Sequence, residues 1–202
     1  MFRKLFNLAM FASLITASTI AASAQSSASA RTLPRASDVS LSVLELKSAD
    51  GKSFKIDSLR GRVVVASFGA TWCVPCIVEL QALEELKQEY KGKPIEFVWV
   101  SIDDSEQISN TLLRHYAKER KLTMPVLRDP TREAFANFAT RARVPMVVVF
   151  DADGNFAAPV LTGMSEPEPY KSRLRLRLDS LLLASEDKTK MRRGVSTKAA
   201  IK

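Results

Sequence analysis

The stretch Phe68-Gly69-Ala70-Thr71-Trp72-Cys73-Val74-Pro75-Cys76 decides the fold of this 202-residue chain. It continues an apolar, β-branched run from Arg62 to Phe68, which is typical of a strand buried on both faces of a sheet. Apolar residues then recur at helical spacing from Ile77 to Tyr90, with glutamates and lysines between them. A Cys-x-x-Cys pair between a buried strand and a helix is a strong signal for thiol–disulfide chemistry.

The two cysteines of this motif are the only cysteines in the chain. A disulfide that closes so small a loop restricts the unfolded chain very little, so its value must be chemical. Cys73 is expected at the first turn of the helix, where unpaired N–H groups and the helix dipole stabilise a thiolate. Pro75 suits that turn because it lacks an N–H and has a fixed φ. The spacing therefore predicts Cys73 as the attacking residue and Cys76 as the more buried resolving thiol.

Predicted strands and helices alternate along the rest of the chain. Further strands are expected at 41–46, 95–102, 125–127 (a short edge strand) and 144–150, and further helices at 107–120 and 170–182. A hairpin turn is expected at Asp151-Ala152-Asp153-Gly154. This order predicts an α/β fold, with a mixed central sheet and helices on both faces.

The N-terminal segment has the features of an export signal. Arg3 and Lys4 precede an apolar stretch, and Ala22-Ser23-Ala24 offers small residues to a signal peptidase. Residues 1–24 are therefore predicted to be a signal peptide, with a retained membrane anchor through residues 5–22 as the alternative. The predicted location is outside the cytosol, where disulfides persist and a Cys-x-x-Cys protein acts on the disulfides of other proteins.

Composition predicts the remaining boundaries. Residues 25–38 are rich in serine and alanine and predict a flexible leader, 39–184 the folded domain, and 185–202 a disordered basic tail. The net charge of +8 comes mostly from the ends, with +2 from Arg3 and Lys4 and +4 from 185–202. A nucleic-acid partner is therefore not expected, and membrane contact is expected only if the N-terminal segment is retained.

Metal binding is not expected at the cysteine pair. A structural zinc site needs four ligands, whereas this chain offers two cysteines and a single histidine, His115. His115 lies far along the chain from the cysteines, so it is predicted to be a surface or packing residue. No cofactor is expected beyond the redox-active Cys73–Cys76 disulfide.

The residues from Phe68 to Cys76 closely resemble the active-site stretch of thioredoxin-like proteins of the TlpA/ResA group. Further segments resemble that group too, namely Leu59-Arg60-Gly61-Arg62, Val100 to Asp104, Val144-Pro145 and Asp151 to Gly154, so the resemblance covers about 41–183. It implies a three-layer thioredoxin-like fold and an exported thiol–disulfide oxidoreductase. The implied reaction is reduction of the disulfides of periplasmic proteins. A membrane electron donor of the thiol–disulfide type would supply the electrons. Service in cytochrome c or metal-centre maturation is one expected role.

The resemblance also implies roles for residues around the cysteines. Pro145 would follow a cis peptide bond close to the cysteines, and the backbone of Val144 would pair with a substrate peptide. Glu79 matches an acidic position that ResA-like reductases use near the active site, the alternative being a solvated helix glutamate. Trp72 would pack beside the sulfurs and cover substrate, the alternative being ordinary core packing.

Three positions depart from the pattern of the group. Ser67 stands where thioredoxin carries a buried acid, so the base for Cys76 is left open, with Glu79 as the best candidate. Gly69 replaces a bulky aromatic residue, and Met146 follows the proline where a small polar residue is more usual.

Two other functions stay open at the level of sequence. The same cysteines run in the opposite direction would make an oxidase or isomerase, because direction depends on the reduction potential. A Sco-like copper-delivery module shares the fold, although it would need a wider cysteine spacing and a nearby histidine.

Overall fold

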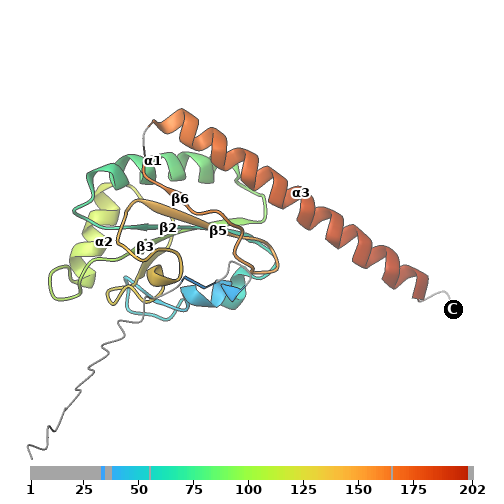
Figure 1. Ribbon diagram of the computed structural model, residues 1–202, viewed down its shortest axis with the longest axis horizontal. Coiled ribbons are helices and arrows are strands. Elements are labelled where there is room, and N and C mark those ends of the chain that lie inside the picture. Colours follow the sequence, from blue (N-terminus) through green and yellow to red (C-terminus); the bar gives the residue numbers. More distant parts are fainter. Residues whose placement is uncertain (1–32, 35–37, 55, 165, 200–202) are drawn as a thin grey trace, which may run out of the picture. The chain divides into compact units, whose positions relative to one another are not determined.

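The computed structural model describes residues 33–34, 38–54, 56–164 and 166–199 (Figure 1). The predicted signal peptide at 1–24, and with it the alternative anchor at 5–22, lies outside the described residues. The same holds for most of the predicted leader at 25–38. Among the helices of the described part, none is both long and apolar enough to cross a membrane.

The sheet of the described part has six strands. They are β1 (Lys47–Ser48), β2 (Val63–Gly69), β3 (Ile95–Ser101), β4 (Val126–Arg128), β5 (Met146–Phe150) and β6 (Leu161–Thr162). Their order is β1-β4-β3-β2-β5-β6, in which β2, β3 and β4 are parallel and the other three strands run antiparallel to their neighbours. The sheet is mixed, as predicted, and β2 lies near its centre. β4 is not an edge strand, because β1 pairs with its outer side.

Helices and 3₁₀ turns cover the two faces of this sheet. The α-helices are α1 (Val74–Glu89), α2 (Asn110–Glu119) and α3 (Pro167–Ala199), and the 3₁₀ helices are η2 (Leu41–Leu44), η3 (Ile56–Leu59) and η4 (Phe135–Asn137). Side chains alternate between the faces of a strand. Val63 and Val65 of β2 accordingly pack in one buried cluster with residues of all three α-helices, and Val64, Ala66 and Phe68 pack in another with residues of the 3₁₀ helices. The predicted three-layer α/β architecture is confirmed.

The predicted strand at 41–46 is wrong. Leu41–Leu44 forms η2 instead, and only Lys47–Ser48 joins the sheet. Leu41 and Leu44 are both buried, and a spacing of three residues places them on one side of a 3₁₀ helix. Over so few residues, the spacing of apolar side chains does not distinguish a β-strand from a 3₁₀ helix.

The predicted disordered tail at 185–202 is also wrong over its described part, because α3 continues to Ala199. The tail is rich in lysine and arginine, which favour helix, and it holds no proline. Lys188 in this extension lies on the Asp151–Gly154 turn, with its Nζ 2.7 Å from Asp153 Oδ2. The predicted domain boundary at residue 184 therefore falls within a helix.

Candidate active site

The turn between β2 and α1 holds the cysteine pair. Cys73 is the N-cap residue of α1, and its Sγ accepts a hydrogen bond from the backbone N–H of Cys76 at 3.2 Å. The two residues form a disulfide, with their Cα atoms 5.3 Å apart. Pro75 lies in the first turn of α1, as predicted. Cys73 keeps 4% of its surface exposed and Cys76 none, so Cys73 is the more accessible of the two.

Asp103 anchors this turn to the neighbouring strand. Its carboxylate accepts hydrogen bonds from the Thr71 backbone N–H at 3.0 Å and from the Thr71 hydroxyl at 2.9 Å. The Ser101 hydroxyl donates a third bond at 2.8 Å. Asp103 is 1% exposed, and it holds in place the loop that presents Cys73. Sequence reasoning missed this role, although an acid at the carboxyl end of a strand parallel to β2 was the available signal.

Glu79 lies buried at the contact of α1, β2 and α3. The Ser67 hydroxyl donates a hydrogen bond to Glu79 Oε2 at 2.6 Å, and the Tyr170 hydroxyl donates one to Oε1 at 2.9 Å. Burial raises the pKa of Glu79 to about 7, and the two hydrogen bonds hold it below the value that burial alone would give. Glu79 is 1% exposed, so it is not a solvated helix residue.

Gly69 allows α1 to approach β2 closely. A Cβ at this position would lie 2.8 Å from Trp99 Nε1 and 3.3 Å from Cys76 Sγ. This chain has only a hydrogen atom at this position, and an indole from the neighbouring strand β3 lies against it. The Gly69 departure noted in the sequence thus has a physical counterpart in Trp99.

The outer side of the site is apolar. Trp72 is 60% exposed, so it is not a core residue, and Val74 and Val78 beside it are also exposed. The Val144–Pro145 peptide bond is cis, as the resemblance implied. Met146, which follows Pro145, pairs with Phe68 near the end of β2. Val144 and Pro145 therefore lie at the same end of the sheet as the cysteines.

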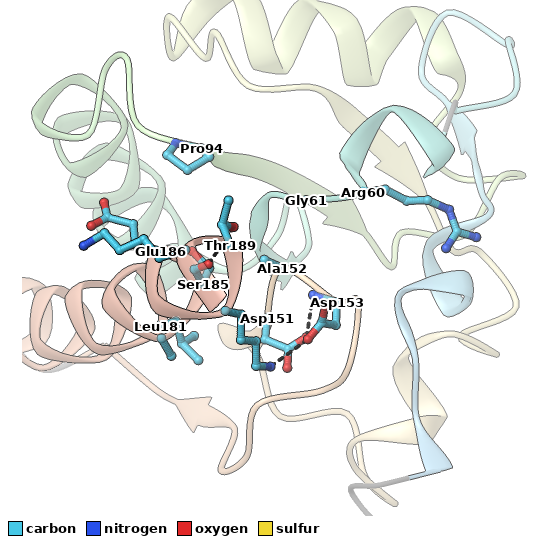
Figure 2. A pocket seen from close by; sticks show the side chains of 13 residues that line it. Arg60, Gly61, Pro94, Asp151, Ala152, Asp153, Leu181, Ser185, Glu186 and Thr189 are labelled. Carbon is cyan, nitrogen blue, oxygen red and sulfur yellow. Dashed lines mark hydrogen bonds and ion pairs between the residues drawn. The ribbon is translucent and has the colours of Figure 1, made fainter. Parts of the chain in front are cut away.

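The hollow drawn in Figure 2 lies at the opposite end of the sheet. It is lined by Arg60 and Gly61 ahead of β2, Pro94 ahead of β3, the turn at 151–153 and α3 residues between 181 and 190. The cysteines follow the carboxyl end of β2, whereas these lining residues precede β2 and β3. This hollow is therefore not part of the cysteine site.

His115 does not belong to the cysteine site. Its side chain is 66% exposed on α2, with Nε2 3.1 Å from Glu119 Oε1. Over the described ranges, no three His, Cys, Asp or Glu side chains gather as a metal site.

A mixed sheet, a disulfide at the junction of its central strand with a helix, and a cis-proline at the same end define a thioredoxin-fold protein with a Cys-x-x-Cys centre. The Redoxin family model matches residues 27–170, and the chain belongs to this family.

The chain is also similar to curated relatives, and solved structures share its fold. The thiol-disulfide oxidoreductase ResA of Oceanobacillus iheyensis is 36% identical over 84 residues, which are 42% of this chain and 42% of ResA. The matches span 42–62% of the length of the first curated relatives. A thiol:disulfide interchange protein of the thioredoxin family from Chlorobium tepidum has the same fold, with a TM-score of 0.56, 23% identity, and coverage of 67% of this chain and 90% of that one. A secreted Mycobacterium tuberculosis disulfide oxidoreductase, described as homologous to E. coli DsbE, also has the same fold. Its TM-score is 0.54 at 18% identity, and the match covers 66% of this chain and 97% of that one.

Proposed function

We propose that this protein is an exported thiol–disulfide oxidoreductase that reduces disulfides of periplasmic proteins. The observation that carries the proposal is the Cys73–Cys76 disulfide at the N-terminus of α1, in which Cys73 keeps 4% of its surface exposed and Cys76 is fully buried. The ResA relatives are named for the same chemistry. The charged and apolar start of the chain supports export.

The reaction consists of two thiol–disulfide exchanges. The Cys73 thiolate attacks one sulfur of a substrate disulfide, which forms a mixed disulfide and releases the other substrate sulfur as a thiolate that takes up a proton. Cys76 then loses its proton and attacks Cys73 Sγ, which releases the second substrate thiol and leaves the Cys73–Cys76 disulfide. Two electrons pass from the protein to the substrate, and a membrane electron donor of the thiol–disulfide type returns them.

Glu79 is the proposed proton acceptor for Cys76. It follows Cys76 by three residues on α1, so both side chains lie on one face of the helix. A carboxyl group with a pKa of about 7 is present in both forms at neutral pH, as efficient proton exchange requires. Ser67, at the strand position where thioredoxin carries its acid, donates a hydrogen bond to Glu79. The carboxyl group in this chain is therefore carried by helix α1, at Glu79, and not by strand β2.

The proposed substrate surface surrounds Cys73. Trp72 and Val74 offer exposed apolar area on either side of this residue, and the Val144 backbone at the cis-proline would pair with an extended substrate segment. An apolar surface with one backbone strip suits unfolded or partly folded proteins of varied sequence. Copper delivery has no such support, because His115 pairs with Glu119 on the exposed face of α2.

Trapping of mixed disulfides tests this proposal. A Cys76→Ser variant, expressed from the whole chain, lacks the resolving sulfur and should accumulate covalent adducts with exported proteins. We expect these adducts to disappear on reduction and to be absent in a Cys73→Ser/Cys76→Ser control. Adducts with cytosolic proteins alone, or no adducts that depend on Cys73, would contradict the proposed function.

A further inference from the structure

The Trp99 indole is a buried hydrogen-bond donor without an acceptor. Trp99 lies in the middle of β3 and is fully buried. Its Nε1 has no hydrogen-bond partner among the residues that the structure describes. Leaving a buried donor unpaired is unfavourable, and a buried tryptophan N–H usually finds a partner. In this structure, with the disulfide formed, the Trp99 N–H is therefore a buried donor without an acceptor.

The Trp99 N–H lies against Gly69. The same Cβ position over Gly69 would lie 2.8 Å from Trp99 Nε1 and 3.3 Å from Cys76 Sγ, so the nitrogen and the sulfur border one small space. The parallel register places Trp99 beside Ser67, on the same face of the sheet as Gly69. The Tyr116 ring stacks on the indole, with centroids 5.4 Å apart and planes at 25°. The indole is thus held in place beside the resolving cysteine.

Reduction of the disulfide would change how well the Cys76 sulfur accepts a hydrogen bond. While the S–S bond exists, Cys76 Sγ is neutral and accepts hydrogen bonds weakly. Two-electron reduction breaks that bond and leaves a thiol or a thiolate on Cys76. In a buried place, an N–H donor favours the charged form of its acceptor over the neutral one.

We propose that the Trp99 N–H donates a hydrogen bond to the Cys76 thiolate, and so makes the dithiol form of the centre easier to reach at alkaline pH. The proposal deepens the proposed function, because it rests on the cysteine pair cycling between disulfide and dithiol. Gly69 takes part as the position that leaves room for the indole.

Other titratable and charged groups lie on the elements packed around Cys76. They are Cys73 and Glu79 on α1, Asp103 after β3, Tyr116 and Arg120 on α2, and Tyr170 on α3. Trp99→Phe leaves all of these groups in place, so it tests the contribution of the indole N–H alone.

Trp99→Phe keeps an aromatic ring and removes the N–H. The equilibrium constant between the variant and dithiothreitol, measured from pH 5 to pH 10, gives the reduction potential at each pH. At pH values above the pKa of Cys76, we expect the variant to be about tenfold harder to reduce than the unchanged protein, which corresponds to a potential about 30 mV more negative. The difference should vanish at pH values well below that pKa, because the thiolate is then absent.

A purely structural role would give a different result. Loss of packing alone would produce an offset independent of pH, and either such an offset or identical potentials throughout would overturn the proposal. Phe97→Leu is the matched control, since it changes a buried ring on the same face of β3 two residues earlier. It should show no pH-dependent difference.

A second measurement does not depend on the Trp99→Phe variant folding. The chain has two tryptophans, so Trp72→Phe leaves a single indole N–H signal in a ¹⁵N–¹H spectrum. On reduction, this signal should move downfield and should titrate together with Cys76. A signal that does not move on reduction would overturn the inference, whereas failure of the unchanged protein to reduce any protein disulfide would overturn the proposed function instead.

Discussion

Cys73→Ser should reduce catalysed insulin reduction by dithiothreitol to the uncatalysed background, a loss of at least about a thousandfold. The reaction begins with a thiolate, and a serine hydroxyl is not a nucleophile towards disulfides at neutral pH. Cys76 cannot replace Cys73 as the attacking residue, because its sulfur is fully buried. Turbidity of the precipitating insulin chains measures the rate.

The substitution should leave the fold intact, which makes the loss interpretable. Cys73 caps α1 by accepting the Cys76 N–H, and serine is among the best N-cap residues. The variant should therefore unfold at nearly the same temperature as the reduced, unchanged protein. Retained insulin reduction in a folded Cys73→Ser variant would remove Cys73 from the mechanism.

Glu79→Gln should slow the resolving step by roughly 100-fold at pH 7, within the range expected for loss of a general base. The step is followed as glutathione release during a single oxidation of the reduced protein by glutathione disulfide. In the unchanged protein, its rate should rise with pH through about 7, as Glu79 loses its proton. The variant should lack this rise. Glu85→Gln is the control, since Glu85 lies on the exposed side of the same helix.

Glu79→Gln should slow the resolving step but make the folded protein more stable at alkaline pH. The folded-state pKa of Glu79, about 7, lies above its ordinary value of 4.5, so the folded protein binds the proton more tightly than the unfolded chain. This contribution favours folding at low pH and is lost as pH rises from about 4.5 to about 7. At pH 8, the glutamine variant should be more stable by about 3 kcal/mol, and near pH 4 the two should be equal. Equal stability at both pH values, with an unchanged rate, would rule out Glu79 as the buried acid.

The central part of the site could be predicted from sequence because its signals are local. The apolar run of β2, the Cys-x-x-Cys spacing and the helical period after Ile77 lie within one continuous segment. The register of β2 on β3 is not local, and it is this register that brings Trp99 to Gly69. The sequence of a buried strand does not predict which residue of the neighbouring strand its tryptophan will contact.

Contacts between residues far apart in the sequence could not be predicted for the same reason. Tyr170 meets Glu79 across 91 residues, so the burial of Glu79 follows only once α3 packs against α1. The length of α3 does not follow from composition, because charge and low hydropathy predict disorder, whereas lysine and arginine also favour helix. Composition alone does not decide between these two outcomes.

The reduction potential of the Cys73–Cys76 pair tests the central claim most directly. Equilibration of the purified protein with glutathione and dithiothreitol buffers at pH 7 gives this potential from the fraction of dithiol. A reductase of periplasmic disulfides should have a value near thioredoxin's, about −270 mV. A value near that of the strong oxidant DsbA, about −120 mV, would contradict the account and assign the protein to disulfide formation.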